Sequence, residues 1–198
     1  MTDGGTADTA VRWERGNDGL KPRYLPEAPP DDAPEEEDDH EIGLCVLRLD
    51  RAPKQPERLF MQFHGGVYRS DDAGRSWSEI GEGLPSDFGF PLVVDPADPD
   101  SAYVIPVTTS DRVVPDGRVL VWETRDGGSS WSPRGDGLPA EHAYLTVLRR
   151  AFDRVGEGDD LELYFGATSG EVFGSGDAGA TWATAALRLP PVYSVTAS

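Results

Sequence analysis

The sequence predicts an all-β fold, a partial β-propeller of about three complete four-stranded blades with partial blades on either side. Four tryptophans, each followed seven residues later by a leucine, recur at steps of 64, 54 and 51 residues. An internal period of this size is typical of repeat architectures. No window shows an apolar period of 3.6 residues, so almost no helix is expected.

Three eight-residue segments align without gaps and share the pattern Ser/Thr-x-Asp-x-Gly-x-Ser/Thr-Trp. A short carboxylate can accept hydrogen bonds from the N–H groups of its own turn, and glycine supplies a positive φ. The tryptophan then buries a large ring. Each copy is therefore predicted to be a self-satisfied turn between two strands. The residues expected to build these turns are Ser70, Asp72, Gly74 and Trp77, then Thr124, Asp126, Gly128 and Trp131, then Ser175, Asp177, Gly179 and Trp182.

A fourth, decayed copy is visible near the N-terminus. It keeps Thr6, Asp8 and Trp13, but alanine and arginine stand where glycine and Ser/Thr are expected. Residues 1–20 are accordingly interpreted as the remnant of a preceding blade.

The repeated motif resembles the Asp-box, or BNR, repeat of sialidases, sortilin-type receptor domains and other β-propellers, over roughly residues 6–198. In that family the box lies on the turn between the third and fourth strands of a blade, away from the ligand-binding end. The resemblance implies that the box aspartates are structural, with a calcium-binding or catalytic role as the alternative.

The chain starts inside a repeat and ends on a predicted first strand, which suggests the C-terminal half of a six- to eight-bladed propeller. A truncated gene, one half of a split propeller and a protomer that closes by forming a homodimer all remain open.

The flanking residues supply the predicted strands. Blades are expected at about 42–82, 90–137 and 143–187, followed by a terminal strand at 192–197. Short apolar and β-branched runs bounded by turn residues predict them. The predicted first strands are 44–49, 91–94 and 144–149, the second strands 59–63, 101–105 and 161–165, and two of the third strands 67–69 and 119–124.

The charge balance narrows the class of partner. The net charge is −18, and only two of the 18 basic residues are lysines, a composition that resembles proteins of salt-loving microbes, where ionic strength screens self-repulsion. An acidic surface argues against nucleic acid, because a binder needs basic groups to displace counterions. Residues 21–41 form an acidic, proline-rich insertion, expected to be a solvated loop, with a weak divalent-cation site as the alternative.

The sequence carries no run of about 20 apolar residues, so no membrane span is expected. The N-terminus lacks a basic-then-apolar signal, which favours a cytoplasmic location. The single cysteine, Cys45, is expected to be a small buried hydrophobe. No cofactor and no metal site is predicted.

A ligand is expected at the face opposite the boxes, where the resemblance places family ligands near the central axis. Few polar groups fall in the loops assigned to that face. The candidates are His64, Asp111, Arg112, Asp116, Glu141 and His142, with Phe88 and Tyr144 as possible stacking surfaces.

Two functions follow from these features. The first is a non-catalytic binding or scaffold module for a protein, peptide or glycan. The alternative is a glycoside hydrolase, exo-sialidase-like, whose catalytic set is incomplete in this chain. Sialidases use clustered arginines, a tyrosine–glutamate nucleophile pair and an aspartic acid, whereas other propeller glycosidases need two carboxylates roughly 5–9 Å apart on the loop face.

Overall fold

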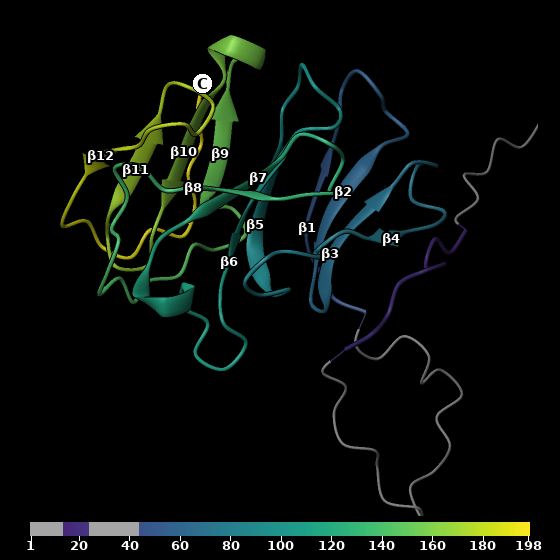
Figure 1. Ribbon diagram of the computed structural model, residues 1–198, viewed down its shortest axis with the longest axis horizontal. Helices are drawn as coiled ribbons and strands as arrows, with labels where there is room; N and C mark the ends of the chain where they lie inside the picture. Colours follow the sequence, from purple (N-terminus) through teal and green to yellow (C-terminus); the bar gives the residue numbers. More distant parts are fainter. Residues whose placement is uncertain (1–13, 24–43) are drawn as a thin grey trace, which may run out of the picture.

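The computed structural model describes residues 14–23 and 44–198 and is built from β-sheet (Figure 1). In these ranges the helical structure consists of two short 3₁₀ turns, η2 (Pro115–Gly117) and η3 (Gly158–Asp160). No helix among the described residues is long and apolar enough to cross a membrane. The decayed motif copy at residues 6–13 and most of the insertion, residues 24–41, lie outside the described ranges.

The described residues form three four-stranded antiparallel sheets, and each sheet uses four strands that are consecutive in the chain. We call them blades 1, 2 and 3. Blade 1 contains β1 (Val46–Arg51), β2 (Leu59–Phe63), β3 (Gly66–Ser70) and β4 (Ser78–Glu79). Blade 2 contains β5 (Gly89–Val94), β6 (Ala102–Pro106), β7 (Val121–Thr124) and β8 (Ser132–Arg134). Blade 3 contains β9 (Phe152–Val155), β10 (Glu162–Gly166), β11 (Val172–Ser175) and β12 (Ala183–Ala186).

The blades lie side by side in chain order, and their first strands are neighbours, with β5 in contact with both β1 and β9 (Figure 1). The largest apolar cluster fills the space between sheets and includes Ile105, Leu163 and Phe165, all fully buried. Asp50 on β1 joins all three first strands, because it accepts hydrogen bonds from the Val94 N–H at 2.9 Å and from the Arg154 guanidinium at 2.5 Å.

The repeated motif forms the turn between the third and fourth strands of each blade. We call these turns, Ser70–Trp77, Thr124–Trp131 and Ser175–Trp182, the carboxylate turns. In the first, the Ser76 hydroxyl and N–H donate to the Asp72 carboxylate at 2.6 and 2.9 Å. The equivalent bonds recur at 2.6 and 2.9 Å in the second turn and at 2.6 and 2.8 Å in the third.

Each tryptophan of a carboxylate turn reaches back to the segment that precedes its own blade. The Trp77 indole N–H donates to the Gly16 carbonyl at 2.9 Å, and the Trp131 indole N–H donates to the Ile80 carbonyl at 2.7 Å. The Trp182 main-chain N–H donates to the Asp136 carbonyl at 2.8 Å. Residues 14–20 therefore occupy on blade 1 the place that the end of blade 1 occupies on blade 2.

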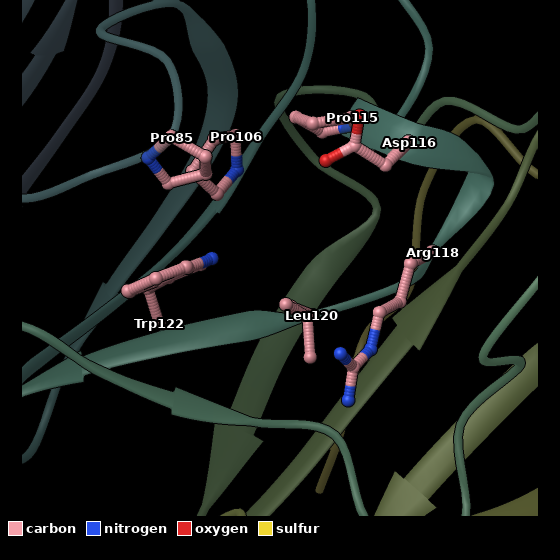
Figure 2. Close-up of a pocket in the computed structure, with 7 residues that line it drawn as sticks. All are labelled: Pro85, Pro106, Pro115, Asp116, Arg118, Leu120 and Trp122. Carbon is pink, nitrogen blue, oxygen red and sulfur yellow. The ribbon is translucent and has the colours of Figure 1, made fainter.

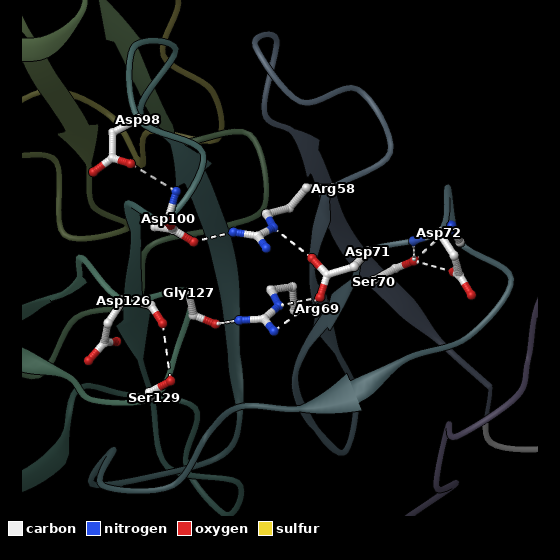
Figure 3. Close-up of polar contacts among 11 residues, drawn as sticks. Arg58, Arg69, Ser70, Asp71, Asp72, Asp98, Asp100, Asp126, Gly127 and Ser129 are labelled. Atoms are coloured by element: carbon white, nitrogen blue, oxygen red, sulfur yellow. Dashed lines mark hydrogen bonds and ion pairs between the residues drawn. The ribbon is translucent and has the colours of Figure 1, made fainter.

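An ionic network reinforces the junction between blades 1 and 2 on the side of the carboxylate turns (Figure 3). Asp71 accepts from Arg58 Nε at 2.6 Å and from Arg69 Nη2 at 3.0 Å. The two arginines then cross to blade 2, where Arg58 pairs with Asp100 and Arg69 donates to the Gly127 carbonyl at 2.5 Å.

Two predicted strands differ from the structure. Residues 144–149 form no strand, and the first strand of blade 3 is β9, at Phe152–Val155. Residues 144–149 bond instead to loops, since Val114 N–H donates to the Leu145 carbonyl and Thr168 N–H to the Thr146 carbonyl. Residues 192–197 also form no strand; Ser194 makes a single parallel bridge to Arg150.

Candidate binding surface on the loop face

The antiparallel order of the strands separates two ends of each blade. The carboxylate turns share one end with the connections between first and second strands, including η3 (Figure 1). The connections between second and third strands, including η2, share the opposite end with the linkers between blades. We call this second end the loop face, and all the predicted site residues belong to its segments.

Two of the predicted residues, His64 and Phe88, meet at the junction of blades 1 and 2, with ring centroids 5.4 Å apart. Phe88 packs edge-on against Phe90 at 5.2 Å, and the Arg149 guanidinium lies 5.1 Å from the Phe90 ring. Phe88 is only 3% exposed. The expectation that it offers a stacking surface is therefore wrong; its ring belongs to the core and supports His64.

Three other predicted residues, Glu141, His142 and Tyr144, line one hollow of about 280 Å³ between the blade 2–3 linker and blade 3. We call it the blade 3 hollow. Tyr144 is 72% exposed and Leu187, on the far side, is 59% exposed. The remaining lining residues are Pro139, Ala143, Leu145, Ser169, Glu171, Phe173 and Thr184.

Ser169 and Glu171 were not singled out by the sequence, although they supply much of the polarity of this hollow. The Ser169 hydroxyl donates to the Glu171 carboxylate, which fixes that carboxylate at the start of β11. The alternation of β11 could have indicated them, because Glu171 and the buried Phe173 stand two residues apart and two-residue spacing places side chains on one face of a strand.

Asp111 and Arg112 lie at the exposed tip of the β6–β7 connection and do not line the blade 3 hollow. Their loop nevertheless contacts the blade 2–3 linker, because the Arg112 carbonyl accepts a hydrogen bond from the Thr146 hydroxyl. Left-handed backbone occurs on both sides of this contact, and also at Ala73, Ala178 and Arg188, which lie outside it. Arg112, Asp116 and His142 have φ values of 56°, 55° and 56°, a left-handed conformation that costs energy for residues with a side chain. Such strain persists only where the surroundings hold it.

A second, smaller hollow of about 160 Å³ lies beside blade 2 and contains the predicted residue Asp116 (Figure 2). We call it the blade 2 hollow. Pro85 and Pro106 lie together near Trp122, and Pro115, Asp116 and Arg118 approach from the η2 side (Figure 2). Leu120 completes the lining.

The two hollows occupy equivalent places in consecutive blades. Pro85 and Pro139 each follow the leucine that ends the preceding blade. Trp122 and Phe173 each stand four residues before the aspartate of a carboxylate turn. The propeller repeat therefore produces one hollow per blade junction, and the side chains lining it differ from blade to blade.

Buried charge elsewhere in the described residues is structural. Glu123 is 2% exposed and accepts hydrogen bonds from the Tyr103 hydroxyl at 3.0 Å, Arg125 at 2.7 Å and Arg134 at 2.8 Å. Burial, followed by the charge of Glu123, raises the pKa of Tyr103 and keeps its hydroxyl protonated. In the described ranges no group of three or more His, Cys, Asp or Glu side chains is placed to hold a metal ion.

Comparisons with known proteins identify the fold. No family model and no curated protein matches this chain. An ancestral GH74 enzyme aligns with 70% of this chain at 18% identity and a TM-score of 0.52. The GH74 xyloglucanase from Xanthomonas campestris aligns with 71% at 20% identity and a TM-score of 0.53. YCF48 from Cyanidioschyzon merolae aligns with 71% at 16% identity and a TM-score of 0.45.

The aligned region spans only 18% and 20% of the two GH74 chains. At this identity the likeness concerns the fold alone. Together with three four-stranded antiparallel sheets, it shows an all-β, propeller-type architecture.

Proposed function

We propose that this chain is a non-catalytic Asp-box propeller module that binds a polypeptide segment in the blade 3 hollow. The observation that carries the proposal is the composition of the hollow, which is lined by the exposed Tyr144 and Leu187 together with two carboxylates and a hydroxyl. Exposed aromatic and apolar surface contributes most of the binding energy at protein interfaces, and a few polar groups fix orientation. The Asp-box assignment draws support from the identical hydrogen bonds of the three carboxylate turns.

The size of the hollow favours a side chain over a long oligosaccharide. At about 280 Å³ it lies just below the usual range of roughly 300–1,000 Å³ for small-molecule sites. One or two residues of a peptide fill such a space. His142, which lines the hollow, has a left-handed backbone with φ of 56°.

The test is selection of peptides from a random phage-displayed library on the purified protein. We expect selected peptides to bind the wild-type chain and to bind Tyr144→Ala about tenfold or more weakly, as truncation of an aromatic anchor does. The matched control is Tyr193→Ala, because Tyr193 is 65% exposed but does not line the hollow. Equal loss in both variants, or loss in neither, would contradict the proposal.

A hydrolase remains a second candidate because one observation favours it: Glu141 and Glu171 lie in the same hollow. A pair of carboxylates is the usual acid and nucleophile or base of a glycosidase. Under this hypothesis the protein releases reducing ends from a polysaccharide such as xyloglucan. Glu141→Gln and Glu171→Gln would each abolish that release, and an inactive wild-type protein would exclude the hypothesis for that substrate.

A further inference from the structure

Residues 192–197 lie against blade 3 in the way that a first strand lies against the blade before it. At the junction of blades 1 and 2, the Val94 N–H on β5 donates to the Asp50 carboxylate at 2.9 Å. Beside blade 3, the Ala197 N–H donates to the Asp153 carboxylate at 3.1 Å.

The strand registers make the two aspartates equivalent. Asp50 lies opposite Phe60, and Asp153 lies opposite Tyr164. Each of these aromatic residues in turn faces the residue that immediately precedes a carboxylate turn. Residues 192–197 therefore take on blade 3 the place that β5 takes on blade 1.

The other end of the segment agrees with this placement. In blade 1 the closest approach to Gly89, the first residue of β5, is made by Gln62, whose Oε1 would lie 3.1 Å from a Cβ there. Gly166 holds the position of Gln62 in blade 3, and a Cβ on Gly166 would come within 2.8 Å of Val192 Cβ.

The segment differs from the three first strands in one respect: no second strand lies beside it among the described residues. In blades 1 to 3 each first strand pairs with an antiparallel second strand. The N–H groups of Val192 and Val195 donate instead to the Ala167 and Arg150 carbonyls of blade 3. The opposite edge of residues 192–197 is unpaired, which explains why they form no strand although they occupy the place of one.

A hollow of about 300 Å³ opens between this segment and blade 3, near the C label in Figure 1. We call it the end hollow. It shares no lining residue with the blade 3 hollow. Its lining residues are Val155, Glu162, Tyr164, Val172, Val195, Thr196, Ala197 and Ser198.

The junction of blades 1 and 2 shows what fills the equivalent space. There Phe60 and Val67 of blade 1 belong to one buried cluster with Leu92 on β5. The second strand of blade 2, β6, completes this cluster with Ala102 and Val104. At the junction of blades 2 and 3 the second strand again supplies two buried apolar residues, Leu163 and Phe165.

The end hollow keeps the walls of that cluster and lacks the second-strand pair. Val67 and Val172 each stand three residues before a carboxylate turn, and Leu92 and Val195 each stand two residues before the N–H that bonds to the aspartate. The counterparts of Phe60, Val67 and Leu92 are Tyr164, Val172 and Val195, and all three line the end hollow.

We propose that the end hollow and the free edge of residues 192–197 accept an antiparallel β-strand from a partner protein, in the place of a second strand. The partner strand carries two apolar residues separated by one residue, as β6 and β10 do. Pairing with the free edge supplies main-chain hydrogen bonds, and the hollow selects the side chains. This inference concerns a different site from the proposed function and stands independently of it.

Charge narrows the choice of partner. At the junction of blades 1 and 2, Arg58 pairs with Asp100, two residues before β6 begins. Glu162 holds the position of Arg58 in blade 3, so a basic residue in the place of Asp100 would complement it. The second strands of this chain carry Glu57, Asp100 and Leu161 at that place, which argues against a second copy as the partner.

The probe is the capped, fluorescently labelled peptide Lys-Ser-Ala-Tyr-Val-Ile-Pro, and the readout is fluorescence polarisation. It copies residues 100–106 with lysine in place of Asp100. We expect it to bind the full chain. The control peptide Lys-Ser-Ser-Tyr-Asn-Ile-Pro has the same charge but polar residues at the two inward positions, and it should bind about tenfold or more weakly. Equal binding of the two peptides would overturn the inference.

The protein variant that tests the hollow is Val172→Gln, which places a polar side chain on its wall. We expect it to weaken binding of the probe about tenfold or more. The matched control is Val46→Gln, because Val46 is an exposed valine on β1 that does not line the end hollow. Binding that is unchanged in Val172→Gln, or weakened equally in both variants, would contradict the proposed site.

Hydrogen exchange on the wild-type chain tests the strand pairing without any substitution. Thr196 holds the place of Val93, which lies opposite Tyr103 of β6. We therefore expect the bound probe to slow exchange of the Thr196 amide and to leave the amides of residues 14–20 unchanged. Absence of binding to the wild-type chain, or binding without slower exchange in residues 192–197, would overturn the inference.

Discussion

At the scale of single residues, the acidic side chains divide into two groups. The carboxylates of Asp72, Asp126 and Asp177 accept hydrogen bonds from their own turns. Glu141 and Glu171 instead face an open hollow. The sequence could separate the groups because the turn aspartates repeat in a fixed motif, whereas the hollow acids do not.

Because of the aspartates in the carboxylate turns, the free energy of unfolding should depend on pH in the acidic range. Hydrogen bonds from the Ser130 hydroxyl and N–H lower the pKa of Asp126 from 3.8 to about 2. Because the pKa of Asp126 is lower in the folded state than in the unfolded state, its carboxylate stabilises the fold fully above about pH 4. This contribution to the free energy of unfolding is lost as the pH falls toward 2. We expect Asp126→Asn to lower the melting temperature at pH 7, with a gap to wild type that narrows between pH 4 and 2.

Asp111→Asn provides the control, because Asp111 is exposed and lies outside the carboxylate turns. Its small effect should stay constant over the same pH range. An Asp126→Asn gap that does not narrow in acid would show that the carboxylate charge contributes nothing to the turn.

At the scale of elements, the turns were easier to predict than the strands beside them. The carboxylate turns follow from local chemistry, since their partners lie within four residues. Residues 144–149 have the alternation of a strand, with Leu145 and Val147 buried, yet their backbone partners are loops. Alternation reports which face is buried and says nothing about what the backbone bonds to.

The candidate site shows the same limit. Glu141, His142 and Tyr144 were found because they lie in one linker. Glu171 and Leu187 were missed because their proximity to that linker depends on how blade 3 packs. Phe88 was misjudged because a single aromatic in a loop gives no sign of whether it is buried, and only the contacts with His64 and Phe90 decide it.

The segment that ends each blade offers an element-scale prediction. The residue before its leucine adopts a left-handed φ in every case, as glycine at positions 19, 83 and 137 and as Arg188, with φ of 60°, in blade 3. We expect Arg188→Gly to stabilise the protein by about 0.5–1 kcal/mol, the relief of strain less the entropy cost of glycine. Differential scanning calorimetry measures it.

Arg188→Ala separates strain from charge in that experiment. Alanine removes the guanidinium but keeps the Cβ that resists the left-handed backbone, so no stabilisation is expected from it. Equal stabilisation by both substitutions would mean that the arginine charge, rather than its backbone, is the unfavourable feature.

At the scale of the whole molecule, local attraction competes with global repulsion. Ion pairs join neighbouring blades, Asp50 with Arg154 and Arg58 with Asp100, while the net charge of −18 favours repulsion within the chain. Salt screens both the ion pairs and the repulsion between like charges, but it screens the ion pairs less because their groups are partly buried.

We therefore expect potassium chloride to raise the melting temperature. Most of the rise in melting temperature should occur below about 0.5 M. The Debye length shortens from about 10 Å at 0.1 M to about 3 Å at 1 M, so most of the long-range repulsion is already screened at the higher concentrations. A matched concentration series of sucrose, which carries no charge, controls for effects of excluded cosolute. A fall in melting temperature with salt would show that the ion pairs outweigh the repulsion.

The direction of the tryptophan contacts has a consequence for how the chain leaves the ribosome. Trp77 bonds to Gly16, Trp131 to Ile80 and Trp182 to Asp136, so each reaches toward residues already synthesised. The four strands of each sheet are also consecutive. A nascent chain therefore never waits for a later segment to complete a blade, and it can add finished units in order from the N-terminal end, with little unpaired edge exposed at any moment.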